Sequence, residues 1–207
     1  MTDKFSIHHI IDYLRQMGIK IARWDYRRDI IELAFHSNHG QWRMIIGMQQ
    51  KEDLGKLLLI VPHFGTVATT RRMECLEALM TVNYRTTIGK FGLDPDDGEI
   101  RLEETIPLAT NTITLEQFQL AFTALMQTVS TYHSLLPRII YGNLSVEEAL
   151  QRCEQDFAQE YRPNDQLEEG NTTNPDIHGE TVLDKPTDLD INEVMAEVTW
   201  LLEQRKE

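Results

Sequence analysis

The sequence predicts an α+β fold with an antiparallel sheet, and three observations support this prediction. Segments with strand-like composition cluster along the chain and do not alternate with helical segments, which argues against parallel βαβ units. Short polar sequences connect consecutive strand candidates, and connections of that length join antiparallel neighbours. Two of the helical segments begin with sequences that cap a first turn. We therefore expect helices packed against an antiparallel sheet.

The first part of the chain predicts one helix and four strands. Apolar residues three and four apart indicate an amphipathic helix over about residues 5–17, and Gly18 is typical of the position just beyond a helix. Four strand candidates follow, and polar turns that contain Asp25, Ser37 and Asp53 separate them. The strand candidates are residues 19–24, 29–35, 42–48 and 56–61.

The middle of the chain predicts helices around one further hairpin. A helix is expected from Thr70 to about Asn83. The turn 94–98 ends in Asp-Gly between the strand candidates 85–93 and 99–107, which is a strong hairpin signal. Two capping boxes come next. The first, 114–117, opens a long helix to about Leu135 that Pro137 is expected to stop; the second, 145–148, opens a helix to about Tyr161.

The last quarter of the chain has a different composition. Residues 1–160 carry 16 Lys and Arg against 21 Asp and Glu, whereas residues 161–207 carry 4 against 12. Few large apolar residues occur in 162–189, so this stretch is predicted to be a flexible, acidic, disordered linker after a domain formed by 1–161. Residues 190–207 form a predicted amphipathic C-terminal helix. Its apolar face supplies the candidate partner-binding residues, which are Ile191, Val194, Met195, Val198, Leu201 and Leu202. This helix could dock on its own domain or on a partner.

Charge and composition indicate where the protein works. A formal net charge of −13 opposes binding to nucleic acid and to anionic membranes. No apolar run reaches the roughly 20 residues that a membrane-spanning helix needs. The N-terminus lacks the layout of a secretory signal, and the widely separated Cys75 and Cys153 are expected to be reduced, packed thiols. We expect a cytoplasmic protein.

No constellation for catalysis is expected. His36 and His39 lie three residues apart in a predicted turn without further nearby ligands, so they are interpreted as solvated histidines. The acidic turn at 94–99 lacks the glycine and glutamate positions of a calcium loop. Glu103 and Glu104 would point to opposite faces of a strand and cannot act as a pair. No cofactor and no metal are predicted.

The strands are unusually apolar on both faces. Residues 30–35 and 44–48 are nearly continuous runs of apolar side chains. Continuous apolar strands are typical of sheets that are covered on both sides. The helices of the domain would cover one face. The second cover could be a second subunit, the C-terminal helix, a client segment or further helices of the same chain.

Several of these segments together resemble a known family. The strand 57–61, the helix 73–80, the glycine-containing strand and hairpin 89–100, and the helix start 115–118 resemble the YbjN family of bacterial sensory transduction regulators, which shares its fold with type III secretion chaperones. The resemblance covers 57–136 most clearly. It implies an antiparallel sheet with helices against it and a homodimer, and it carries over no catalytic residue.

Two functional hypotheses follow. The first is a non-enzymatic protein-binding adaptor or chaperone-like regulator, since the secretion chaperones to which the family is similar bind extended client segments without ATP. The alternative is a small-molecule-sensing regulatory domain with a ligand between sheet and helices.

Overall fold

The computed structural model describes residues 5–37, 40–51, 54–67, 70–108, 112–160 and 189–190. Its sheet has the strand order β1-β2-β3-β4-β6-β5, and every neighbouring pair on this path is antiparallel. A short strand, β7, pairs with β2 in parallel. The strands are β1 Arg23–Asp25, β2 Ile30–Ser37, β3 Gly40–Lys51, β4 Leu54–Thr66, β5 Lys90–Leu93, β6 Glu99–Leu108 and β7 Leu189–Asp190. The predicted α+β class with an antiparallel sheet is confirmed.

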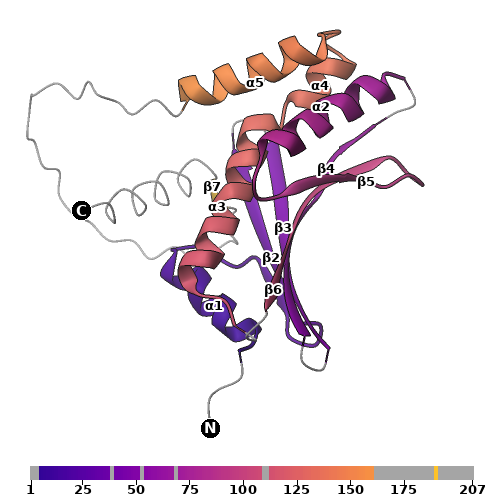
Figure 1. Ribbon diagram of the computed structural model, residues 1–207. Coiled ribbons are helices and arrows are strands. Elements are labelled where there is room, and N and C mark those ends of the chain that lie inside the picture. The colour runs from indigo at the N-terminus through magenta and orange to yellow at the C-terminus, as the bar shows by residue number, and fades with distance from the viewer. Residues whose placement is uncertain are drawn as a thin grey trace, which may run out of the picture.

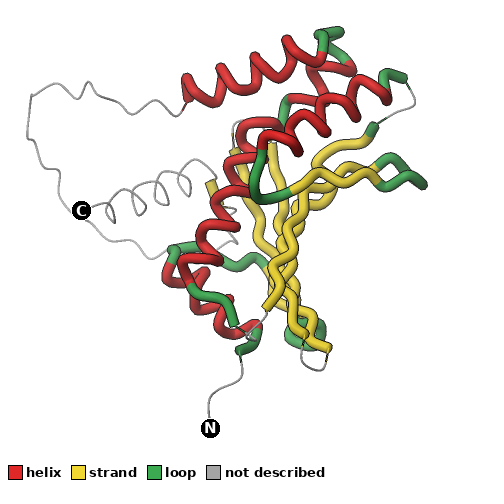
Figure 2. Tube along the Cα trace, in the orientation of Figure 1, coloured by secondary structure: helices red, strands yellow, loops and turns green. Residues whose placement is uncertain are grey.

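The helices lie on one side of this sheet. Figure 1 shows α1 and α3 beside the strands and α2, α4 and α5 stacked beyond one end of them, and Figure 2 shows the same separation of helices from strands. The opposite side of the sheet carries no helix of the described chain. The helices are α1 Ile7–Gln16, α2 Arg72–Arg85, α3 Leu115–Tyr132, α4 Leu135–Ile140 and α5 Val146–Glu160.

The core lies between the sheet and α1 and α3. Leu33 in β2, Met44 in β3 and Leu59 in β4 are completely buried. Phe122 of α3 lies against Phe35 with ring centroids 6.3 Å apart. Alternate residues along a strand point to opposite faces, so the buried residues of β2, β3 and β4 define one inner face that meets the helices.

The capping and hairpin predictions are confirmed. The Thr114 hydroxyl accepts from the Gln117 amide at 3.2 Å, and the Gln117 side chain accepts from the Thr114 amide at 3.0 Å. The Glu148 carboxylate accepts from the Ser145 amide at 3.0 Å and so completes the second box. In the turn between β5 and β6, Gly98 has φ +79°, a conformation that favours glycine.

The first strand candidate, 19–24, is mostly wrong because only Arg23–Asp25 is a strand. The backbone before it completes the end of α1. Gly18 has φ +71°, its amide donates to Arg15 O at 3.1 Å, and the Ile19 amide donates to Leu14 O at 2.8 Å. These bonds form a Schellman motif, which satisfies carbonyls of the last helical turn. Ile19 is thereby turned into the core, where it is 4% exposed.

Two helix boundaries also differ from the prediction. The helix expected to end at Asn83 continues to Arg85, and the strand expected from 85 begins only at Lys90. Asn83 explains the delay, because its side chain accepts from the Phe91 amide at 2.7 Å and donates to the Phe91 carbonyl at 3.0 Å. The long helix ends at Tyr132, and Pro137 lies inside the following helix. Proline is tolerated there because first-turn amides have no partner within a helix.

The predicted linker and terminal helix fall almost wholly outside the described residues. Of residues 162–207, the structure describes Leu189 and Asp190, which form β7. The candidate partner-binding residues lie outside the described residues. The division at 161 and 189 therefore stays a prediction.

Candidate binding surfaces of the sheet

The described residues do not assemble a metal-binding cluster. No group of three or more His, Cys, Asp and Glu side chains in the described part of the chain could hold a metal ion. Cys75 and Cys153 are buried, as predicted, and burial raises the pKa of both thiols. A raised pKa keeps a thiol protonated and so a poor nucleophile. The interpretation of His36 as a solvated turn residue is wrong, because His36 is a partly buried residue of β2; His39 is not described.

The paired acids take separate roles. Glu104 accepts a hydrogen bond from the Gly89 amide at 2.7 Å, whereas Glu103 lies 2.9 Å from the Arg101 guanidinium. The two carboxylates therefore stabilise different parts of the β5–β6 region, which agrees with the prediction that they do not act together.

The outer face of the sheet carries an apolar patch. Ile45 and Ile60 are cross-strand neighbours, and the row continues to Glu32 on one side and Glu103 on the other. Along the next row, Ile30, Gly47 and Leu58 are in register. The apolar members are partly exposed and are not packed against the core. We call these residues the outer patch: Ile30, Ala34, Ile45, Leu58 and Ile60.

Charges of both signs border the outer patch. Arg43 donates to Glu32 at 3.0 Å, and Arg101 lies 2.9 Å from Glu103. An apolar centre with a mixed charged rim is the usual composition of a protein-binding surface. A rim with both signs can also face a second copy of the chain. A twofold axis brings the same surface of two copies together, so positive groups of one rim can lie opposite negative groups of the other.

A second candidate surface is the edge of β2 that faces away from β3. β1 pairs with residues 30–32 of β2, whereas β7 pairs with Phe35 and His36 on the same edge. Backbone groups on an exposed edge can bind another extended segment. The edge from Leu33 to Ser37 is therefore a place where a strand can be added, and β7 already uses part of it.

A cavity opens where β3 and β4 separate. Pairing between these strands ends at Ile45 and Ile60, and the register of β4 with β6 shifts between Val61 and Gly65. Pro62 lacks an amide hydrogen and cannot donate to the ladder. His63 has φ +51°, and the Glu99 carboxylate accepts from its backbone amide at 2.9 Å. These features bend β4 away from β3.

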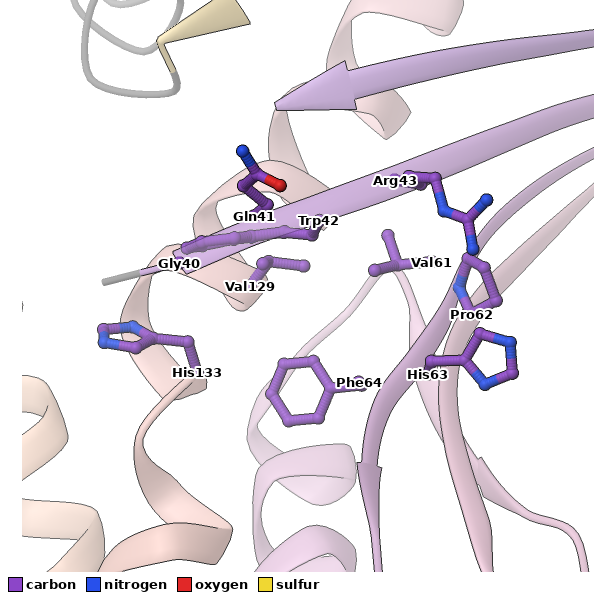
Figure 3. A pocket seen from close by; sticks show the side chains of 10 residues that line it. All are labelled: Gly40, Gln41, Trp42, Arg43, Val61, Pro62, His63, Phe64, Val129 and His133. Carbon is purple, nitrogen blue, oxygen red and sulfur yellow. The ribbon is translucent and has the colours of Figure 1, made fainter. Parts of the chain in front are cut away.

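The cavity has a volume of about 380 Å³ and lies between β3, β4 and α3 (Figure 3). Phe64 points into it, while His133 comes from the end of α3. The Trp42 and His133 rings lie 5.9 Å apart. The lining combines aromatic, histidine and arginine side chains, which suits a small planar ligand with an acidic group. The lining residues are Gly40, Gln41, Trp42, Arg43, Val61, Pro62, His63, Phe64, Val129 and His133.

Sequence reasoning found the apolar outer strands and expected, as an alternative, a ligand between sheet and helices, but it identified neither the lining residues of the cavity nor the β2 edge. One sequence signal pointed to the cavity, namely Pro62 inside an otherwise regular apolar strand pattern. The edge has no comparable signal because the partner of β2 comes from the far end of the chain.

A comparison with known protein families identifies the family of this chain. The model of the YbjN family, described as a putative bacterial sensory transduction regulator, matches residues 7–136. The chain belongs to this family. The predicted resemblance is thus confirmed, and it extends further toward the N-terminus than the residues 57–136 that carried it most clearly. No curated protein matches the chain.

Two solved structures are similar to the chain at low sequence identity. One is the HopA1–SchA chaperone–effector complex, with a TM-score of 0.44, 13% identity, and coverage of 62% of this chain and 94% of that chain. Another is the crystal structure of YbjN from E. coli, with a TM-score of 0.44, 11% identity, and coverage of 64% of this chain and 94% of that chain.

Among the described residues, none of the helices combines the length and the apolar composition that crossing a membrane requires.

Proposed function

We propose that this protein is a non-enzymatic, protein-binding adaptor or chaperone-like regulator that works in the cytoplasm as a homodimer. The outer patch carries this proposal, because several large aliphatic side chains are partly exposed there on a sheet face that no helix of the described residues covers (Figure 1). Contiguous exposed apolar surface with a polar rim marks interaction sites in soluble proteins. The family description, which concerns signal transduction, supports a regulatory role.

The second copy is the proposed occupant of the outer patch. Ile45 and Leu58 lie near its centre, and the rim pairs Arg43–Glu32 and Arg101–Glu103 offer both charges to a symmetric partner. With the outer patches facing each other, the two sheets would stack as in a sandwich. The C-terminal helix would then remain available for a client protein, through the face formed by Ile191, Val194, Met195, Val198, Leu201 and Leu202.

Sedimentation of three full-length forms tests the dimer. We expect the wild-type chain to be a dimer at micromolar concentration. The double substitution Ile45→Lys with Leu58→Lys should give a monomer, because two lysines would lose their hydration in the interface. Gln49→Lys is the control. Gln49 lies in β3, as Ile45 does, and its side chain is exposed outside the outer patch. A wild-type monomer would refute the homodimer.

The tail is tested separately by deleting residues 190–207. If the terminal helix holds a client, crosslinking in the native cell should capture a defined protein with the full chain and not with the deletion. Identical crosslinked products from both forms would refute this role for the helix while leaving the dimer unaffected.

The cavity supports a second candidate function, a small-molecule-sensing domain. Its position between β3, β4 and α3 is where the sequence placed a ligand in the alternative hypothesis. A panel of small aromatic carboxylic acids should raise the melting temperature of the wild-type chain. The rise should shrink in Arg43→Gln and persist in the double-lysine variant of the outer patch. No shift with any acid would count against sensing by this cavity.

A further inference from the structure

The exposed edge of β2 is divided between two short partners. β1 covers it from Ile30 to Glu32, where Arg23 is in register with Glu32. Beyond that point, β7 is the strand in the described part of the chain that pairs with this edge, through Phe35 and His36. The other edge of β2 is fully paired with β3 from Ile30 to Ser37.

The direction of the backbone groups follows from one hydrogen bond. The Ala22 amide donates to Glu32 O at 3.0 Å, so the Glu32 carbonyl faces the β1 side. Backbone groups alternate in direction along a strand, and therefore those of Ala34 and His36 face the same edge. Those of Leu33 and Phe35 face β3. The edge beyond β1 thus offers the amide and carbonyl groups of two residues to an added strand.

β7 occupies this edge only weakly. It contributes two residues, Leu189 and Asp190, in a parallel arrangement. Strands of this length contribute little stability on their own. The contact depends on the covalent connection through residues 161–188, which raises the local concentration of the segment at the edge. A longer segment from another molecule could form more ladder bonds and displace it.

We propose that the β2 edge from Leu33 to Ser37 is a strand-addition site that Leu189–Asp190 of the same chain occupies as a built-in competitor. This site rests on the proposed protein-binding function, and it would be a second binding surface of the protein beside the outer patch. The partner is an extended protein segment with an apolar residue in register with Phe35, since residues paired across strands share a face. Phe35 is 1% exposed on the helix side of the sheet.

A reversible crosslink tests whether the chain's own tail occupies the edge. In the full chain, His36→Cys combined with Asp190→Cys places two thiols in register across β2 and β7. Neighbouring strands bring Cα atoms within the range that a disulfide spans. We expect mild oxidation to give an intramolecular disulfide, while each single-cysteine variant stays uncrosslinked. A product of twice the chain mass would show occupation by another molecule's tail and would overturn the proposal.

A labelled peptide with the sequence of residues 184–194 then reports on the free edge. By fluorescence anisotropy, the reduced double-cysteine chain should bind the peptide, and the oxidised chain should bind it at least about tenfold more weakly, because the site is then filled. Leu189→Pro with Asp190→Pro in the full chain should bind it roughly two- to fivefold more tightly than wild type, since the competitor is removed. Equal affinities in the oxidised and reduced forms would overturn the proposal.

Two edge variants show where the peptide binds. His36→Pro removes an amide that faces the edge and should abolish binding, whereas His36→Thr keeps the amide and should retain it. Loss of binding in both variants would overturn the assignment to the backbone edge. Sedimentation of the same variants separates the strand-addition site from the dimer. If peptide binding fails while the dimer persists, only the strand-addition site is refuted. If the dimer is absent while the crosslink still controls peptide binding, only the dimer is refuted.

Discussion

Within the middle of β4, the two faces of the sheet carry the same kind of aliphatic residue in very different surroundings. In β4, Leu57, Leu59 and Val61 are at most 1% exposed on the inner face, whereas Leu58 and Ile60 are partly exposed on the outer face. Figure 1 shows α1 and α3 on one side of the sheet and no described helix on the opposite side. The difference shows that an apolar strand face becomes core only where another layer covers it, and otherwise remains available as a binding surface.

A pair of alanine substitutions in β4 should show the largest effect. Leu59→Ala leaves a cavity in the core and should lower the free energy of unfolding by about 2–5 kcal/mol. Leu58→Ala, on the outer face of the same strand, should cost less than about 1 kcal/mol in the monomer, because little packing is lost. Urea denaturation of both variants, each in an Ile45→Lys background that places a lysine in the proposed dimer interface, measures this. Equal costs would show that the outer face is also core.

The free energy of unfolding should also fall at alkaline pH, because a tyrosine is buried in the helix layer. Burial and the adjacent Glu154 raise the pKa of Tyr132 to about 12, and its hydroxyl donates to Glu154 at 3.0 Å. The unfolded chain releases this proton near pH 10 while the folded chain keeps it, so stability is complete below pH 10 and falls between pH 10 and 12.

Tyr132→Phe tests that pH dependence. It should reduce the slope of stability against pH between 10 and 12, although it loses the hydrogen bond to Glu154 at all pH values. Urea melts at intervals of half a pH unit measure the slope. Tyr84→Phe is the control, because Tyr84 is 92% exposed. An unchanged slope in Tyr132→Phe would contradict the buried, hydrogen-bonded state of the phenol.

A smaller effect is expected at the start of α5, within the helix layer. Ser145→Ala removes the hydroxyl that accepts from the Glu148 amide at 3.2 Å and should cost about 1 kcal/mol. Ser145→Asp retains an acceptor and should recover most of this loss. Thermal unfolding of the two variants makes the comparison, and an equal loss in both would show that the cap does not stabilise the helix.

The smallest effect is expected on the rim of the outer patch. Arg43→Ala removes an exposed ion pair with Glu32 and should change stability by less than about 0.5 kcal/mol. The same variant should weaken the dimer more clearly, because the rim charges would face the second copy. If stability fell by several kcal/mol, Arg43 would belong to the fold rather than to a binding surface.

Local chemistry explains most of what could be predicted. The capping boxes at Thr114 and Ser145 and the Asp-Gly hairpin depend on neighbouring residues, and the structure confirms all three. The errors have nonlocal or cooperative causes. Ile19 has the pattern of a strand residue, but its amide completes the end of α1. β5 begins only at Lys90, beside Phe91, whose backbone amide donates to the Asn83 side chain eight residues earlier in the chain.

The candidate sites were less predictable than the fold. The outer patch follows from the apolar runs 30–35 and 44–48, although the sequence did not say which face would lack a helix. The cavity needs β4 to part from β3 at Pro62, and it also needs Val129 and His133 of α3 to lie beneath the gap. The six predicted residues of the terminal helix lie outside the described residues, so that assignment stays a prediction.

By itself, the sequence determined the α+β class, the capped starts of α3 and α5, the hairpin turn and the family, because each depends on short-range patterns of polarity and backbone preference. Only the tertiary structure decided which side of the strands α1 and α3 cover, where β3 and β4 separate, and that Leu189 and Asp190 lie beside Phe35 and His36. These contacts join distant parts of the chain, and the free energy of packing that selects among them is a property of the whole fold.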